Sequence, residues 1–218
     1  MDSHAIVLGS SGLVGNLLLK ILLESKQYHS VTVFVRRQLE IQHPKLRQII
    51  TDFKDFKHLE KDIEGDILFS CLGSTKKKTP KKKDYVFVDK VIPDTFAEIA
   101  SKKGLKQFHL VSAIGANSDS SIFYNRLKGE LEDSIKEKKI PSINIYQPSL
   151  IKGKRKEFRF GESVFTFFFK LLDILLAGSL NKYRSINALD IAKAMYNVSL
   201  INKKGVYTFT SDKIKELA

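Results

Sequence analysis

A glycine-rich loop near the start of the chain constrains the fold more than any other feature of the sequence. The apolar run at residues 5–8 predicts a short β-strand, and residues 13–23 have the apolar spacing of a helix packed on a sheet. The pattern G-x-x-G-x-x-G joins them, with Gly9, Gly12 and Gly15 at its fixed positions. Such glycines permit a tight turn, let the backbone approach a pyrophosphate, and let the helix pack closely on the strand. The sequence therefore predicts a dinucleotide-binding site at this loop.

Strand and helix patterns alternate along the rest of the chain. Further helices are expected at residues 85–103 and 123–139, and further strands at residues 31–35, 47–53, 66–72, 108–112 and 142–146. Because the strands are nearly continuous apolar runs, they are expected to form a parallel sheet with helices on both faces, a doubly wound α/β fold. No internal repeat or long linker interrupts this order, so the chain is expected to form one domain, residues 1–218.

The residues after the second expected strand favour a phosphorylated cofactor. NAD-binding folds place an acidic residue about 20 positions beyond the glycine loop, on the ribose hydroxyls. Here Arg36 and Arg37 follow the strand, and the nearest downstream acid is Glu40. Two guanidinium groups suit a 2′-phosphate, so NADP(H) is favoured over NAD(H). The alternative is that one arginine simply faces solvent.

Three polar residues form a candidate catalytic group. Tyr124 and Lys128 are four positions apart, so a helix presents both on one face, and Ser112 ends the strand expected before that helix. A free phenol has a pKa of about 10, and a nearby ammonium favours its ionised form. A serine hydroxyl can orient a carbonyl while hydride moves between nicotinamide and carbon. The alternative reading of Y-x-x-x-K alone is a solvated helix face.

Together these motifs resemble the short-chain dehydrogenase/reductases. The detail is most similar to an atypical branch, the HIV Tat-interactive-protein-like NADP-binding proteins. The resemblance runs from Ile6 to about Ala194. It is carried by the glycine loop, the Arg36–Arg37 pair and the segments 71–78, 87–90, 111–132, 147–162 and 189–195. It implies a Rossmann fold with a small C-terminal substrate lobe at roughly residues 150–218.

The resemblance also implies roles for individual residues. At the glycine loop, the residues expected to hold NADP(H) are Gly9, Ser11, Gly12, Leu13 and Val14, with Arg36 and Arg37 at the adenosine phosphate. Asp52 and Phe53 would lie by the adenine, and Leu72 and Gly73 on the ribose and nicotinamide side. Ser112, Tyr124 and Lys128 match the catalytic positions, and the last two would also contact the cofactor.

Two residues depart from the pattern of related reductases. Many of them carry an asparagine for proton relay where this chain has Asp89, and relatives often have arginine at the position of Gln147. The branch also includes members known for regulatory binding. Two functions therefore stay open: an NADP(H)-dependent oxidoreductase acting on an unknown carbonyl or alcohol, and an NADP(H)-sensing regulatory protein that binds another macromolecule.

The formal net charge of +13 favours anionic ligands. Six lysines lie in residues 76–83, KKKTPKKK, in the loop expected after the fourth strand. We interpret this run as a solvated loop near an anionic cofactor or substrate. Nucleic-acid binding through the run is the weaker alternative, because Tyr85 is the nearby aromatic residue for stacking and no nucleic-acid motif is present.

The single cysteine, the apolar segment at residues 163–180 and the start of the chain bear on other possible classes of protein. Cys71 is the single cysteine, so a disulfide framework and a zinc site with two thiolates are excluded, and Cys71 and His109 are interpreted as structural. Residues 163–180 are the most apolar segment, but their uninterrupted runs are much shorter than the roughly 20 residues of a membrane span. They predict a helix buried against the sheet or in a homodimer interface, and the alternative is attachment to a membrane surface. No secretory signal is recognised, so a cytoplasmic protein is expected.

Overall fold

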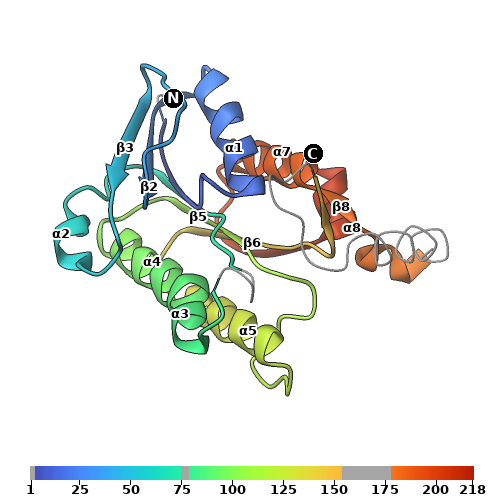
Figure 1. Ribbon diagram of the computed structural model, residues 1–218. Helices are drawn as coiled ribbons and strands as arrows, with labels where there is room; N and C mark the ends of the chain where they lie inside the picture. Colours follow the sequence, from blue (N-terminus) through green and yellow to red (C-terminus); the bar gives the residue numbers. More distant parts are fainter. Residues whose placement is uncertain (1–2, 75–78, 154–177) are drawn as a thin grey trace.

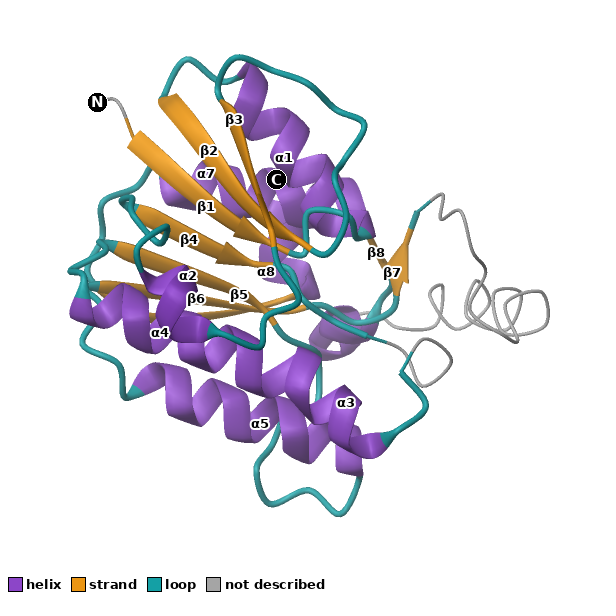
Figure 2. Cartoon of the chain, turned by 60° about the vertical axis from the view of Figure 1, so that its left-hand side comes forward, coloured by secondary structure: helices purple, strands orange, loops and turns teal. Residues whose placement is uncertain are grey.

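A parallel β-sheet between two layers of helices forms the body of the protein (Figures 1 and 2). The computed structural model describes residues 3–74, 79–153 and 178–218. Seven strands pair in the order β3-β2-β1-β4-β5-β6-β9, and all neighbouring pairs are parallel. Their bounds are β1 Ser3–Leu8, β2 Tyr28–Val35, β3 Leu46–Ile50, β4 Ile67–Ser70, β5 Gln107–Val111, β6 Ser142–Gln147 and β9 Gly205–Thr210. This arrangement confirms the predicted doubly wound α/β fold.

Each face of the sheet has its own hydrophobic core. On β1, Ala5 and Val7 belong to the core beneath α1 (Leu13–Glu24), α7 (Ala188–Ser199) and α8 (Ser211–Glu216). Ile6 and Leu8 belong to the core beneath α4 (Ile92–Lys102) and α5 (Phe123–Lys136), with α2 (Phe56–Glu60) at its edge. Successive side chains of a strand point to opposite faces, and a continuous apolar strand therefore supplies both cores.

The helix expected at residues 85–103 is interrupted in the structure. α3 (Lys82–Val86) runs into a π-helix, η1 (Phe87–Val91), before α4 begins. The N–H of Ile92 donates to the carbonyl of Phe87, five residues back, instead of the four residues of an α-helix. The extra residue per turn changes which way the side chains of this segment point.

The other strands and helices expected within the described residues are found within a few residues of their predicted bounds, and α2, α7, α8 and β9 were not predicted. β9 lies at the edge of the sheet and is only partly buried, so it lacks the continuous apolar run of the central strands. Part of the range assigned to a C-terminal lobe therefore belongs to the main sheet and its helices. That lobe as a substrate-binding unit stays a prediction.

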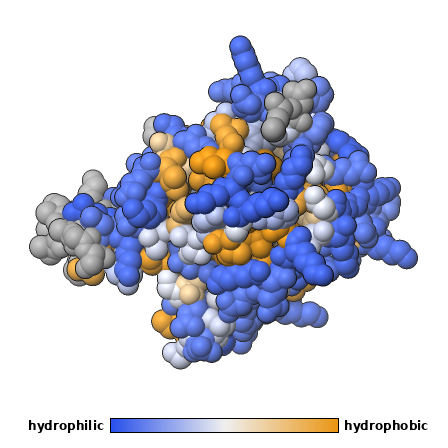
Figure 3. All heavy atoms as spheres, turned by 180° about the vertical axis from the view of Figure 1, so that it is seen from behind, coloured by the Kyte–Doolittle hydropathy of each residue, from blue (hydrophilic) through white to orange (hydrophobic). Residues whose placement is uncertain are grey.

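A small two-stranded sheet, β7 (Ile151–Lys152) with β8 (Ile186–Asn187), and the 3₁₀-helix η2 (Gly178–Tyr183) complete the described structure. Nearly all of the apolar segment 163–180, and lysines 76–78, lie outside the described residues. Within the described ranges, no helix has the length and apolar character needed to cross a membrane. On the rear face, apolar side chains gather near the centre and hydrophilic ones surround them (Figure 3).

Candidate functional site

The glycine loop forms a tight turn between β1 and α1. Gly9 has a φ of +79°, and a Cβ at this position would lie 2.6 Å from the carbonyl oxygen of Cys71. A Cβ at Gly15 would lie 2.3 Å from the carbonyl oxygen of Gly9. The N–H of Gly12 donates to that same oxygen at 2.9 Å. The predicted turn at Gly9 and the close packing at Gly15 are therefore confirmed, while contact with a pyrophosphate stays a prediction.

The N-terminus of α1 is suited to an anion. Gly12 is its N-cap, no side chain caps the helix, and the first turn contains no acidic residue. The first N–H groups of a helix have no partner within the helix, and the helix dipole favours negative charge there. Ser11 and Gly12 are exposed, Leu13 is half-buried and Val14 is buried. The backbone of this turn can therefore hold a phosphate.

The other residues predicted to contact the cofactor follow neighbouring strands at the same edge of the sheet. Arg36 and Arg37 are exposed directly after β2, and Leu72 and Gly73 follow β4. Because the carboxyl ends of parallel strands meet at one edge, these residues share one side of the molecule with the glycine loop.

The two residues predicted to lie by the adenine, Asp52 and Phe53, follow β3 and differ in their exposure. Asp52 is exposed, and its carboxylate lies 3.0 Å from the ammonium of Lys54. Phe53 has a φ of 62° and is buried, with its ring 6.1 Å from that of Phe96. The phenyl ring is therefore part of the core, and only the backbone of Phe53 and the side chain of Asp52 remain to face a ligand.

The predicted catalytic residues lie along α5 and at the end of β5. Lys128 and Ser112 are buried, whereas Tyr124 is 36% exposed. Lys128 is close enough to Tyr124 for the phenol to affect its protonation. Ser112 is hydrogen-bonded to Glu132, one turn beyond Lys128 on the same helix. Lys128 thus lies between Tyr124 and Glu132 along α5, and Glu132 in turn contacts Ser112 at the end of β5.

A buried carboxylate holds Lys128 in place. The Nζ atom of Lys128 lies 3.1 Å from Oδ1 of Asp89 in η1, and both side chains are at most 2% exposed. The other Asp89 oxygen, Oδ2, accepts a hydrogen bond from the backbone N–H of Ser74 at 2.7 Å. Burial alone would lower the pKa of Lys128, but Asp89, Tyr124 and Glu132 outweigh it and raise the pKa above its usual value. The sequence marked Asp89 only as a departure, and the ion pair was not predicted.

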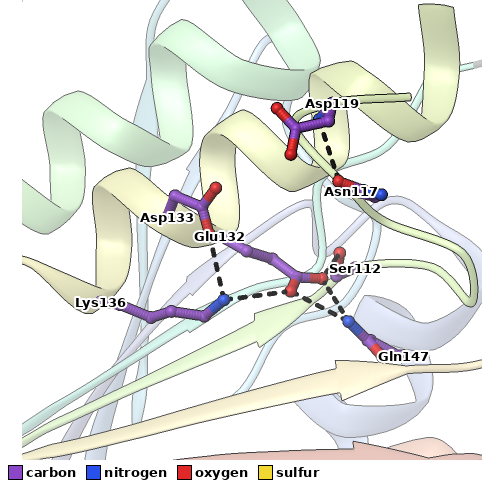
Figure 4. Close-up of polar contacts among 7 residues, drawn as sticks. All are labelled: Ser112, Asn117, Asp119, Glu132, Asp133, Lys136 and Gln147. Atoms are coloured by element: carbon purple, nitrogen blue, oxygen red, sulfur yellow. Dashed lines mark hydrogen bonds and ion pairs between the residues drawn. The ribbon is translucent and has the colours of Figure 1, made fainter. Parts of the chain in front are cut away.

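A second buried carboxylate, missed in the sequence, holds Ser112 (Figure 4). The hydroxyl of Ser112 donates to Oε1 of Glu132 at 2.5 Å. The amide nitrogen of Gln147 donates to both Glu132 oxygens, at 3.0 and 2.9 Å, and Lys136 lies 3.8 Å from Oε2. Glu132 is four residues beyond Lys128, and this spacing on one helix face is the signal that could have revealed it.

Cys71 and His109 have structural surroundings, as predicted. The Cys71 sulfur lies 4.0 Å from the sulfur of Met195, and burial raises the pKa of the thiol to about 12. His109 is fully buried, with its ring nitrogens 3.1 Å from the Tyr146 hydroxyl and 2.9 Å from the Gln107 amide oxygen. Burial lowers the pKa of His109 to about 3, so its ring is neutral near neutral pH.

Comparison with known proteins identifies the family. Residues 9–141 match a sequence family described as NAD(P)H-binding. The chain is 36% identical to mitochondrial protein FMP52 of Meyerozyma guilliermondii over 155 residues, 70% of this chain and 67% of the relative. It is 32% identical to protein HTATIP2 of Rattus norvegicus over 165 residues, 74% of this chain and 68% of the relative. The chain is an atypical short-chain dehydrogenase/reductase.

Solved structures with low sequence identity share the fold of this short-chain dehydrogenase/reductase. The Bordetella bronchiseptica enzyme WbmH, solved in complex with NAD⁺, has a TM-score of 0.72 at 15% identity, covering 99% of this chain and 79% of its own. UDP-N-acetylglucosamine 4-epimerase from Methanobrevibacter ruminantium has a TM-score of 0.71 at 17% identity, covering 99% of this chain and 80% of its own. These likenesses show the fold.

The cytoplasmic expectation for this short-chain dehydrogenase/reductase is wrong. The FMP52 relatives of Meyerozyma guilliermondii and Debaryomyces hansenii are named mitochondrial proteins. The expectation depended only on the lack of a recognised secretory signal, and that lack does not choose among compartments.

Proposed function

We propose that this protein is an NADP(H)-dependent oxidoreductase that acts on a carbonyl or alcohol. The observation that carries the proposal is the buried ammonium of Lys128, held beside Tyr124 at the carboxyl edge of a dinucleotide-binding sheet. A charged lysine next to a phenol is the arrangement that proton transfer at a substrate oxygen requires. Membership of the NAD(P)H-binding family supplies the matching redox chemistry.

The chain's own residues fit the cofactor. The uncapped turn at residues 12–14 offers backbone N–H groups to a pyrophosphate, and Gly9 and Gly15 keep side chains out of this turn. Arg36 and Arg37 would pair with a 2′-phosphate, because guanidinium groups bind phosphate with two parallel hydrogen bonds. When bound, NADP(H) supplies or accepts the hydride.

Each catalytic side chain has one task in the proposed reaction. In the direction of reduction, the Tyr124 hydroxyl gives its proton to the substrate oxygen as hydride reaches the carbon. Lys128 stabilises the phenolate that remains and binds the nicotinamide ribose. Ser112 would orient the substrate oxygen by a hydrogen bond once its hydroxyl proton turns from Glu132 to that oxygen. In the direction of oxidation, Tyr124 takes the proton back.

Replacing Tyr124 tests the reaction. Tyr124→Phe removes the proton donor and keeps the ring, so NADPH binding should be unchanged while turnover falls by about 10²–10⁴-fold, the usual contribution of general acid–base catalysis. The measurement is the rate of NADPH oxidation across a panel of aldehydes, ketones and quinones, with NADPH binding followed separately by nicotinamide fluorescence. Unchanged turnover in the variant would reject the assigned role.

Replacing the arginine pair tests the cofactor preference. Arg36→Ala/Arg37→Ala should weaken NADPH binding by about 10-fold or more and leave NADH binding nearly unchanged, because charged hydrogen bonds to the 2′-phosphate are lost. Nicotinamide fluorescence reports both affinities, and the chain contains no tryptophan to overlap with it. Lys102→Ala/Lys103→Ala removes two exposed cations at the far end of α4 and serves as the control. Equal loss with both cofactors would contradict the preference.

One observation favours a second function, an NADP(H)-sensing regulatory protein. The Ser112 proton is already donated to Glu132, so in this state Ser112 can only accept a hydrogen bond from a ligand. The proposed reductase uses Ser112 as a second donor at the carbonyl oxygen beside Tyr124, whereas a binding protein needs no such donor. This function predicts NADPH binding without turnover across the carbonyl panel, together with capture of a macromolecular partner that changes with NADPH. A captured partner that is indifferent to NADPH would contradict it.

We also infer a mitochondrial location, because the FMP52 relatives are named mitochondrial proteins. Fractionation of cells that express the full-length protein should recover it with mitochondrial markers. Recovery with soluble cytoplasmic markers alone would overturn this inference.

A further inference from the structure

Asp89 joins three parts of the site that are far apart in the sequence. It lies on η1, forms a buried ion pair with Lys128 of α5, and accepts a hydrogen bond from the backbone of Ser74 after β4. It also lies beside Gly73, where an added Cβ would be 3.8 Å from its Oδ1. Gly73 and Lys128 are both expected on the nicotinamide side of the cofactor, so Asp89 lies behind that side of the site.

We propose that Asp89 is a positioning residue that keeps the ammonium of Lys128 charged and fixed, so that Lys128 can bind the ribose of the nicotinamide cofactor. This inference rests on the proposed oxidoreductase function. It assigns to Asp89 a direct ionic role in place of the uncharged relay residue of many reductases.

The charges around Lys128 support this role. Among the described residues, the titratable groups that act on Lys128 are Asp89 from η1 and Tyr124 and Glu132 from α5. The carboxylate of Glu132 is occupied by hydrogen bonds from Ser112 and Gln147. The carboxylate of Asp89, in contrast, forms an ion pair with Lys128. A buried lysine without a counter-charge tends to lose its proton. Removal of the Asp89 charge should therefore neutralise Lys128 at alkaline pH.

The contacts of the Lys128 ammonium and the Asp89 carboxylate also support the positioning role of Asp89. An ammonium has three N–H donors, and the contact with one oxygen of Asp89 leaves donors for a ribose hydroxyl and for Tyr124. The second oxygen of Asp89 is engaged by Ser74, so the carboxylate is held from two sides. The π-helical turn directs Asp89 into the interior, where it is 1% exposed, while Asp84 earlier on the same helical run stays exposed.

The test compares NADPH binding in four proteins: the wild type, Asp89→Asn, Asp89→Glu and the control Asp84→Asn. Nicotinamide fluorescence gives the dissociation constant at about pH 6.5 and about pH 9, values that bracket the neutral range. Asp89→Asn should weaken binding by about 10-fold or more at the higher pH and recover at the lower pH, as Lys128 regains its proton. Asp89→Glu keeps the charge and should stay within about threefold of the wild type at both values.

The outcomes distinguish a failure of the positioning role of Asp89 from a failure of the proposed oxidoreductase function. A purely structural role would lower the melting temperature of Asp89→Asn but leave the pH dependence of NADPH binding like that of the wild type, and that result overturns the inference alone. If the wild type fails to bind NADPH at either pH, the proposed function falls and the inference falls with it. A loss of more than about 10-fold in Asp89→Glu that is the same at both pH values also overturns the inference.

A double variant covers the case in which Asp89→Asn does not fold. Asp89→Leu/Lys128→Met replaces the buried ion pair with apolar side chains, an exchange that proteins often tolerate. It should bind NADPH weakly and show no recovery at low pH, because no ammonium remains. Recovery at low pH in this variant would show that another group titrates, and would overturn the role of the Asp89–Lys128 pair.

Discussion

His109 is enclosed in the middle of β5, where Tyr146 and Gln107 contact its two ring nitrogens. Its pKa is about 3 in the folded protein, against about 6.5 in an unfolded chain. Between these values the unfolded state binds one proton more than the folded state. The stability that the neutral ring contributes is therefore fully present above pH about 6.5 and is lost as the pH falls toward about 3.

The difference between the two pKa values of His109 predicts that this one residue makes the folded protein less stable in acid. The free energy of unfolding should fall by about 3 kcal/mol between pH 7 and about pH 4.5 through His109 alone. Urea unfolding at several pH values measures it. His109→Gln should lower the stability at pH 7 but flatten its pH dependence, whereas the exposed control His58→Gln should keep the wild-type slope. An unchanged slope in His109→Gln would assign the acid sensitivity to other groups.

The two carboxylates beside the candidate catalytic group show which contacts can be predicted from local sequence spacing and which cannot. Tyr124 and Lys128 could be found because four-residue spacing on a helix is visible in the sequence. The partner of Lys128 is on another helix and the partner of Ser112 is 20 residues away. Their contacts depend on how α5 packs against η1 and β5, which no local pattern records.

At the scale of secondary structure, the contact between α1 and the end of β1 depends on two glycines. Gly15→Ala would place a Cβ 2.3 Å from the Gly9 carbonyl oxygen, so the helix must move away from the strand. We expect a loss of stability of about 1–3 kcal/mol, as for other overpacked sites, and NADPH binding weakened by about 10-fold or more. Thermal unfolding and nicotinamide fluorescence measure the two effects.

Lys20→Ala is the matched control, because Lys20 is exposed on the same helix. It should leave both measurements near the wild-type values. Wild-type NADPH affinity in Gly15→Ala would show that the loop tolerates the added carbon and that the cofactor does not depend on this close packing.

Central strands and long helices could be predicted because each is an apolar or amphipathic run of ordinary length. β9 could not, since only one of its edges is paired and its side chains are half-exposed. The π-helix could not either. The segment at residues 85–103 has helical spacing throughout, and one additional residue in a single turn does not change the pattern enough to be seen.

Across the whole molecule, the C-terminal segment is built into the same core as the N-terminal one. Tyr28 of β2 donates to the hydroxyl of Ser199, at the end of α7, over 2.5 Å, and the two residues are 171 positions apart. α7 also supplies Ile191, Ala192 and Met195 to the core that α1 covers. Residues beyond 178 therefore stabilise the sheet that carries the glycine loop.

A double-mutant cycle measures this link. Tyr28→Phe and Ser199→Ala should each reduce the free energy of unfolding by about 1–2 kcal/mol, and the double variant should lose less than the sum by about 0.5–1 kcal/mol. Urea unfolding should stay a single transition in all variants. Full additivity would show that the hydrogen bond does not couple the two ends, and a second transition would show that they unfold separately.

At the π-helical turn at residues 87–91, the number of residues in the chain determines which group lies beside Lys128. Each residue of an α-helix turns the chain by roughly 100°, so the additional residue in η1 rotates α3 and Asp89 against α4 by about that angle. α4 cannot follow, because Phe96 and Ala97 are fixed in the core. Deletion of Val91 alone would restore an ordinary helical repeat and carry the carboxylate away from Lys128. Among related sequences, a one-residue gap at this turn would indicate that the lysine has a different counter-charge, even where Ser112, Tyr124 and Lys128 are all matched.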